Sequence, residues 1–183
     1  MTHPLGKHRR KRPTKAEYTG RGMVNTLTLN GSALTPEQVA SVAREGWRVA
    51  VDGAAVGLMT RSRAVVEAHL ADGEAHYGIN TGFGSLSRKR VADGDLAALQ
   101  QNLVRSHAAG VGPELPRDVV RGMMVLLAAS LCRGNSGVRP AVVERLVEML
   151  NSGLTPRVPE VGSVGASGDL APLAHVALAL IGE

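Results

Sequence analysis

The segment from Gly162 to Asp169 is rich in glycine and small side chains, and its backbone could form an electrophile. Gly168 carries no Cβ, so its amide nitrogen could bend back and attack the carbonyl carbon of Ala166. Loss of water from that ring, and then from Ser167, would leave a 4-methylidene-imidazol-5-one (MIO) group, in which a methylene is conjugated to a carbonyl. No ordinary side chain is an electrophile, so MIO would supply chemistry that enzymes otherwise obtain from an electron-sink cofactor.

Other interpretations of this segment are less specific. A glycine-rich turn before an apolar run can simply connect two secondary-structure elements. The segment comes within one residue of the nucleophile elbow Gly-x-Ser-x-Gly, but Asp169 replaces the last glycine, and Pro156 and Pro159 disfavour the strand that should come before it. A phosphate-binding loop would need a lysine and hydroxyl pair that is missing here. On these residues alone, ring formation and a simple turn both stay open.

Composition favours a helical domain. The chain has 183 residues, of which 44% are hydrophobic but only 2% aromatic, so its core must be aliphatic. An aliphatic core is more typical of packed helices than of a β-sandwich, and we expect a mainly α fold with a small β element near the N-terminus. The single cysteine, Cys132, permits no internal disulfide, which suits the cytoplasm, and its apolar neighbours predict a buried structural thiol.

The positive charge is concentrated at the N-terminus. Residues 1–22 hold seven basic residues and one acidic residue, which gives this segment a net charge of +6. The formal net charge of the whole chain is +5, so the remaining residues carry a net charge of −1. We therefore predict a disordered basic tail over 1–22 and no nucleic-acid partner for the folded part. The tail has no apolar region of a signal peptide, and the longest uncharged runs are too short to cross a membrane.

Periodicity and capping residues predict the elements of the first half. Apolar and polar residues alternate over 24–29, which indicates a strand. Thr35 and Gln38 form the pattern of a capping box, with Pro36 at the first helical position. A second strand over 48–51 could pair with the first. A longer helix over about 54–70 is expected to turn three side chains inward, namely Val65, Val66 and Leu70.

Further helices are expected in the second half. Leucines at 96, 99 and 103 mark a helix whose apolar face also holds His107. A second helix is defined by Val119, Val120, Met123, Leu126 and Leu127, and a third begins at Pro140 and ends at Gly153. No spacing of Cys, His and carboxylate residues suggests a metal site.

The segment from Tyr77 to Gly84 places two aromatic residues among three glycines, so it cannot be a helix. Such a loop could form a lid or the wall of a pocket. The alternative is a surface loop that its aromatic side chains hold in place.

Three segments, 77–84, 102–110 and 162–175, together resemble the histidine and aromatic amino acid ammonia-lyase family, and most closely its histidine-specific members. The resemblance runs over 23–183 and implies an aspartase/fumarase-like helical lyase fold. It also implies that Ala166, Ser167 and Gly168 cyclise to MIO, with no dissociable cofactor. Because members of the family are much longer, 23–183 is expected to be the N-terminal part of such a domain, without the C-terminal helical region.

The resemblance implies elimination of ammonia from an α-amino acid, a small-molecule substrate, which for histidine gives trans-urocanate. Tyr77 matches the family's catalytic tyrosine, which as a phenolate could take the β-proton. His107 matches a position associated with the substrate, and Ser106-His107 resembles the histidine-specific form. MIO-dependent tyrosine aminomutases can carry the same pair, although those we know tend to have tyrosine in place of Phe83. The family implies a homotetramer in the cytoplasm, and little or no turnover by the chain alone.

Overall fold

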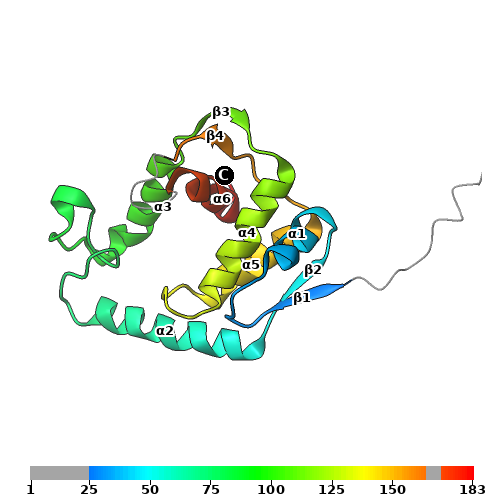
Figure 1. The fold of residues 1–183 in the computed structure, drawn as a ribbon. Helices are drawn as coiled ribbons and strands as arrows, with labels where there is room; N and C mark the ends of the chain where they lie inside the picture. The colour runs from blue at the N-terminus through cyan, green and yellow to red at the C-terminus, as the bar shows by residue number, and fades with distance from the viewer. Residues whose placement is uncertain (1–24, 164–169) are drawn as a thin grey trace, which may run out of the picture.

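Helices make up most of the computed structural model, which describes residues 25–163 and 170–183 (Figure 1). In chain order its elements are β1 (Thr26–Leu29), α1 (Pro36–Arg44), β2 (Arg48–Val51), α2 (Gly53–Ala71), α3 (Leu96–His107), β3 (Val111–Glu114), α4 (Arg117–Leu131), α5 (Pro140–Ser152), β4 (Pro159–Val161) and α6 (Leu170–Ile181), with short 3-10 helices at Gly84–Leu86 and Asp93–Asp95. The mainly α prediction is confirmed. The tail predicted to be disordered lies outside the described residues.

The predicted first strand pair is present, and its strands run parallel with α1 as the crossover. The capping box that begins α1 is formed as predicted: the Thr35 side chain accepts from the Gln38 amide, and the Gln38 side chain accepts from the Thr35 amide. The Asn151 side chain at the end of α5 binds both the amide and the carbonyl of Val49, at 2.9 and 2.8 Å. These local contacts join the small sheet to the helices.

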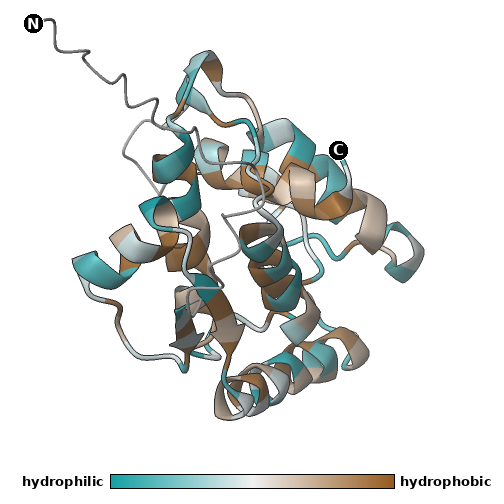
Figure 2. Ribbon diagram, turned by 90° about the vertical axis from the view of Figure 1, so that its right-hand side faces the viewer, coloured by the Kyte–Doolittle hydropathy of each residue, from teal (hydrophilic) through white to brown (hydrophobic). Residues whose placement is uncertain are grey.

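The hydrophobic core lies between α1, α4, α5 and the β1–β2 sheet. Trp47, the single tryptophan, is half-buried and packs against the edge of this core. Figure 2 shows hydrophobic residues gathered along parts of each helix, with hydrophilic residues on other parts. The largest fully buried side chains include Leu29, Met59, Val120, Met124, Val125, Val143, Leu146, Val158 and Val176.

Two polar or reactive groups are buried with the core. Arg121 of α4 is 4% exposed and donates to the carbonyls of Leu150 and Val42, at 3.0 and 2.9 Å. These carbonyls lie at the C-terminal turns of α5 and α1, where helices leave acceptors without internal partners. Cys132 is fully buried, and burial raises the pKa of its thiol, so the predicted structural role is supported.

The buried faces of two helices differ from the sequence prediction. Val65 of α2 is 57% exposed, and the fully buried residues of this helix are Ala55 and Met59, in its first half. Only that half packs on the core, while the second half extends away from it (Figure 1). In α4, Val119 and Leu126 are exposed because the helix turns the face of Val120, Met124 and Ala128 toward its neighbours instead.

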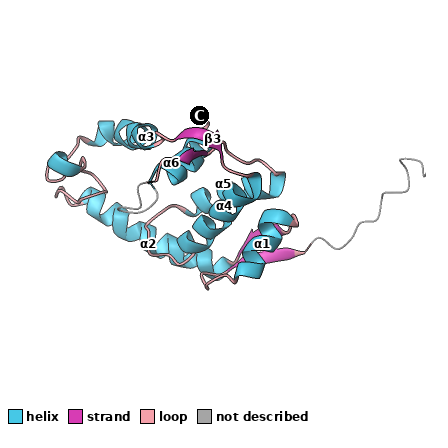
Figure 3. Ribbon diagram, turned by 45° about the horizontal axis from the view of Figure 1, so that its top comes forward, coloured by secondary structure: helices cyan, strands magenta, loops and turns pink. Residues whose placement is uncertain are grey.

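A second small sheet was not predicted. Strands β3 and β4 pair antiparallel with an irregular register, near α3 and α6 and away from the β1–β2 sheet (Figure 3). Pro159 begins β4, so the expectation that Pro159 disfavours a strand there was wrong. Proline is tolerated at the first residue of a strand because no ladder donor is required of it there. None of the helices in the described part of the chain is long and apolar enough to cross a membrane.

Candidate active site

The loop that carries Tyr77 is built around one buried amide side chain. Asn80 is fully buried; its Nδ2 donates to the carbonyl of Glu74 at 2.8 Å, and its Oδ1 accepts from the amide of His76 at 2.7 Å. The backbone of Asn80 is held as well, since its amide donates to the His76 carbonyl and its carbonyl accepts from the amide of Val91. This loop is therefore fixed from within by the hydrogen bonds of a single residue.

Tyr77 itself projects from this fixed loop. Its side chain is 67% exposed, and its ring meets the ring of Phe83 edge-on, with centroids 5.6 Å apart. Together with Gly84, Ser87 and Arg88 it lines a pocket of about 420 Å³. The loop is not helical, as predicted, and the phenol lies where a ligand could reach it.

His107 ends α3, and its ring orientation is set by the helix. The Nδ1 atom lies 2.8 Å from the carbonyl oxygen of Leu103 and 3.2 Å from the hydroxyl of Ser106. A carbonyl oxygen only accepts, so the proton of the neutral ring resides on Nδ1 and the lone pair on Nε2. The half-buried side chain thus offers a hydrogen-bond acceptor at the end of α3.

The second and third sequence segments are in direct contact. The amide of Gly110 donates to Nε2 of His175 on α6, at 3.1 Å. A Cβ built on Gly162 would lie 3.2 Å from the Cα of Gly110, and one built on Gly110 would lie 2.9 Å from that histidine nitrogen. A side chain at Gly110 would displace the His175 ring and crowd Pro159, and one at Gly162 would crowd Ala171 and the Gly110 backbone, so both positions favour glycine. His175 was not singled out as a site residue, although it lies in the segment that carries the resemblance.

The predicted electrophile falls between these contacts in sequence. Ala166, Ser167 and Gly168 lie outside the described residues, but Ser163 before them and Pro172 after them line one groove of about 480 Å³. The remaining lining of this groove is mostly apolar and comes largely from α4: Leu115, Met123, Leu126, Leu127, Ser130 and Leu173. The exposed face of α4 therefore borders the described residues on either side of the segment predicted to form MIO.

An ion pair adds a further link between α3 and α6. The guanidinium of Arg105, in the second segment, binds both carboxylate oxygens of Glu183, with Nε to Oε2 at 2.8 Å. This hydrogen bond lowers the pKa of the Glu183 carboxyl. Among the described residues, no hydrogen bond joins Tyr77 to His107. The structure thus brings together the second and third segments, with the Tyr77 loop lying beyond the other end of α3 (Figure 1).

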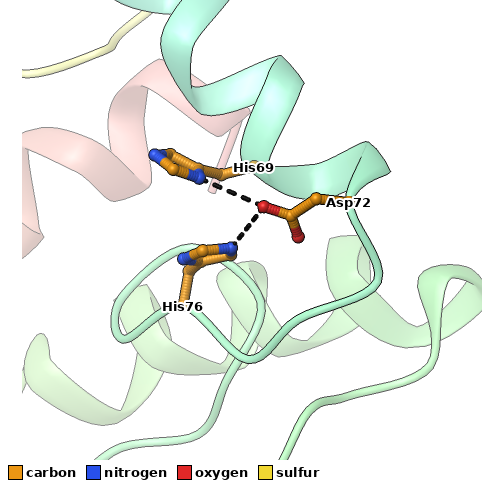
Figure 4. Close-up of side chains that lie close together, drawn as sticks. All are labelled: His69, Asp72 and His76. Atoms are coloured by element: carbon orange, nitrogen blue, oxygen red, sulfur yellow. Dashed lines mark hydrogen bonds and ion pairs between the residues drawn. The ribbon is translucent and has the colours of Figure 1, made fainter.

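A separate cluster lies where α2 ends. Oδ2 of Asp72 is 3.2 Å from Nδ1 of His69 and 2.7 Å from Nε2 of His76 (Figure 4). The backbone amide of Glu74, followed by hydrogen bonds from the two histidines, lowers the pKa of Asp72 to about 2, although partial burial acts against this. No metal-ligand spacing is expected from the sequence, yet these three residues bring their ligand atoms within 4.8 Å of one another. The expectation of no metal site stays a prediction, and these three residues were not singled out in the sequence.

Comparison with known proteins decides the family. The sequence model of the aromatic amino acid lyase family matches residues 34–183. The chain belongs to this family. It is 56% identical over 160 residues to histidine ammonia-lyase from Anaeromyxobacter dehalogenans, a match that covers 87% of the chain and 32% of that relative. The chain therefore spans about a third of the length of the curated relatives it matches.

Solved structures agree with this assignment. Tyrosine aminomutase from Streptomyces globisporus superimposes with a TM-score of 0.81 at 41% identity, over 86% of the chain and 30% of that protein. Histidine ammonia-lyase from Trypanosoma cruzi gives a TM-score of 0.79 at 38% identity, over the same shares of each chain. The predicted resemblance and the helical lyase fold of aromatic lyases are confirmed. The individual roles of Tyr77, His107 and Ser167 stay predictions.

Proposed function

We propose that this chain contributes the MIO-bearing part of an enzyme that eliminates ammonia from L-histidine to give trans-urocanate. The observation that carries this proposal is the contact of Gly110 with Gly162 and His175. Through it the segment 102–110, which contains Ser106 and His107, lies against the residues that precede Ala166. The 56% identity to a histidine ammonia-lyase supports histidine as the substrate.

The residues present fit an MIO group. Ala166, Ser167 and Gly168 have the atoms that its formation needs, and the close approach of Gly162 to Gly110 fixes the chain just before them. Once formed, MIO supplies an electrophile that makes the otherwise weakly acidic β-proton of the substrate removable. Asp169 follows directly and could handle protons during ring closure.

Tyr77 and His107 would perform the proton and binding steps. Tyr77 presents an accessible phenol from a loop that Asn80 holds in place, which suits a general base that must meet a β-proton in one orientation. His107 directs the lone pair of Nε2 outward because Nδ1 donates to the Leu103 carbonyl. It can therefore accept a hydrogen bond from an N–H group of the substrate.

An MIO-dependent tyrosine aminomutase is the second candidate. The similarity to the Streptomyces globisporus tyrosine aminomutase, at 41% identity, favours it. Phe83 favours the lyase, because the aminomutases we know tend to have tyrosine there, and in this chain the Phe83 ring packs edge-on to Tyr77. Activity on another aromatic amino acid would be a third outcome of the same assay.

Assembly and location are also proposals. We propose a homotetramer in the cytoplasm, with no nucleic acid or membrane partner. Exposed apolar side chains on the half of the molecule that carries the site support assembly, since Leu86, Val111 and Leu170 are each more than half exposed. Further protein surface would have to cover them to enclose a substrate.

A chimera tests the proposed activity. The matching 160 residues of the Anaeromyxobacter dehalogenans enzyme are replaced with those of this chain, and the purified chimera is given L-histidine or L-tyrosine. We expect urocanate, detected by its ultraviolet absorbance, and an intact mass lower by two molecules of water than the sequence predicts. Ser167→Ala should abolish both signals. Tyr77→Phe should keep the dehydrated mass and lower the rate about 100-fold or more.

The exposed residue Glu144 gives the matched control, since Glu144→Ala should change neither the mass nor the rate. A β-amino acid formed from tyrosine would favour the aminomutase. An assembled chimera with the mass of the unmodified chain would contradict the MIO proposal. The isolated 183-residue chain should show little or no turnover, because poor positioning alone removes orders of magnitude from such a rate.

A further inference from the structure

We propose that His69, Asp72 and His76 form a binding site for a divalent transition-metal ion, with Zn²⁺ as the ion that suits it best. The two imidazole nitrogens and the carboxylate oxygen converge on one point, where α2 ends and the chain turns back (Figure 4). The proposal is independent of the proposed lyase function, since none of the three residues takes part in that mechanism.

The carboxylate is oriented before any ion binds. Oδ1 of Asp72 accepts the backbone amide of Glu74 at 2.9 Å, which leaves Oδ2 directed at the two histidines. A hydrogen bond to the second oxygen of a ligating carboxylate is the kind of outer contact that fixes metal ligands in proteins. Because the donor is a backbone amide in a tight turn, this orientation does not depend on another mobile side chain.

The two histidines are held by the surrounding backbone. His69 lies in the last turn of α2, one helical turn before Asp72. The amide of His76 donates to the buried side chain of Asn80, at 2.7 Å, which anchors the returning segment. The rings of His69 and His76 therefore face each other with their centroids 4.2 Å apart. Little chain entropy is left to lose when an ion links them.

The ligand set and its dimensions suit zinc. Two imidazoles and one carboxylate with an open fourth position are a common zinc arrangement, with bonds of about 2.1 Å. Ligand atoms around a tetrahedral ion then lie about 3.4 Å apart, by the geometry of those bonds. The separations from Oδ2 are 3.2 Å to His69 and 2.7 Å to His76, and all three ligand atoms lie within 4.8 Å of one another, so side-chain rotations would bring them to that value. The fourth position faces solvent, since all three side chains are partly exposed.

Cobalt titration of the purified 183-residue chain tests the site. Co²⁺ stands in for Zn²⁺ because its visible absorption reports the ligand field, and Zn²⁺ should then displace it and abolish the absorption. We expect one ion per chain and a melting temperature that rises with Zn²⁺. His69→Ala and His76→Ala should each lose the absorption band, and Asp72→Asn should weaken binding at least about tenfold.

Two controls make the result decisive. The double substitution His3→Ala and His8→Ala removes both histidines of the basic tail and should leave the titration unchanged. Circular dichroism should show that each cluster variant keeps its helical content, since the three side chains lie outside the core. Saturable binding that survives in folded His76→Ala, or that disappears in the tail variant, would overturn the proposal, as would the absence of any saturable band.

Discussion

Two regions of the molecule differ in how their helices are covered. We call β1, α1, β2, α4 and α5 the helical core, and residues 72–114 the site-bearing region. Helix α4 of the helical core buries side chains along its whole length. In contrast α3, all of which the structure describes, has no fully buried residue, and Tyr77 and Val111 are exposed on either side of it.

The difference shows that folding stability and the proposed chemistry depend on separate residues. The helical core obtains its stability from apolar burial, which is roughly proportional to the area removed from water. The site-bearing region is held mainly by specific hydrogen bonds, such as those of the Asn80 side chain and the one from the Gly110 amide to His175 of α6. Substitutions should therefore separate global unfolding from local opening.

Removing a core side chain should have the largest effect. Leu146 on α5 is fully buried, and Leu146→Ala is expected to lower the free energy of unfolding by about 3 kcal/mol, through lost burial and the cavity that remains. Urea denaturation followed by circular dichroism measures this. Glu144→Ala, on the exposed face of the same helix, should change it by less than about 0.5 kcal/mol. Similar costs for the two variants would remove the distinction between the regions.

Arg121 should rank second, because its loss removes a donor from two buried carbonyls, and the carbonyl of Leu150 keeps only the amide of Gly153. Arg121→Met keeps the apolar stem but removes the donors to Leu150 and Val42, and should cost about 2 kcal/mol in the same denaturation experiment. Arg117→Met is the matched control, since Arg117 also donates to a helix-end carbonyl, that of Gly153, but is exposed to water. A loss for Arg117→Met as large as that for Arg121→Met would contradict the importance of burial.

Asn80 should affect the site-bearing region alone. Asn80→Ala removes the two side-chain hydrogen bonds that fix the Tyr77 loop, and we expect the amide of Ile79 to exchange with solvent roughly tenfold faster or more. Amides of α5 should keep their protection. Ser85→Ala, an exposed change on the same loop, serves as the control. If Asn80→Ala lost amide protection throughout the chain, the two regions would unfold as one cooperative unit and the distinction between them would be wrong.

The exposed pair of Arg44 and Asp118 should have the smallest effect, and one that depends on pH. Nε of Arg44 donates to Oδ2 of Asp118 at 2.8 Å, and this hydrogen bond lowers the pKa of the Asp118 carboxyl. Because the pKa of this carboxyl is lower in the folded state, its ionised form stabilises the fold at pH values above the pKa of the unfolded chain, about 3.9. This stabilisation is lost as the pH falls through the pKa of the folded state. The free energies of unfolding of the wild type and of Asp118→Asn should thus differ slightly at pH 7 and become equal in acid. If the difference in the free energy of unfolding between the two proteins grew in acid, the predicted direction of the pH dependence would be wrong.

Features set by neighbouring residues could be predicted from the sequence. The capping box of Thr35 and Gln38 depends only on residues within one helical turn, and the αL glycine that ends α5, Gly153, is equally local. The buried face of α2 could not be predicted, because its pattern does not reveal that the second half passes beyond the core. Strands β3 and β4 are paired by distant segments and contain proline, so local propensity argued against them.

The candidate site also combines features that the sequence predicts with features that only the structure shows. The chemistry of Ala166, Ser167 and Gly168 allows MIO but leaves a simple turn equally open. The resemblance to a family favoured MIO and also supplied the roles predicted for Tyr77 and His107. The contact of Gly110 with His175 could be found only in three dimensions. The cluster of His69, Asp72 and His76 was not singled out, although its i, i+3, i+7 spacing is that of one helical face. Helix α2 ends at Ala71, and it is the turn after Asp72 that returns His76 to His69.

The position of Trp47 has a consequence for optical measurements. It is the only tryptophan in the chain, and it packs against the edge of the helical core rather than near Tyr77. Tryptophan fluorescence will therefore change when the helical core unfolds, and it will not change when only the Tyr77 loop opens. A fluorescence melting curve that looks like a single transition is compatible with earlier loosening around the proposed site, so a second chromophore placed near Tyr77 is needed to observe that step.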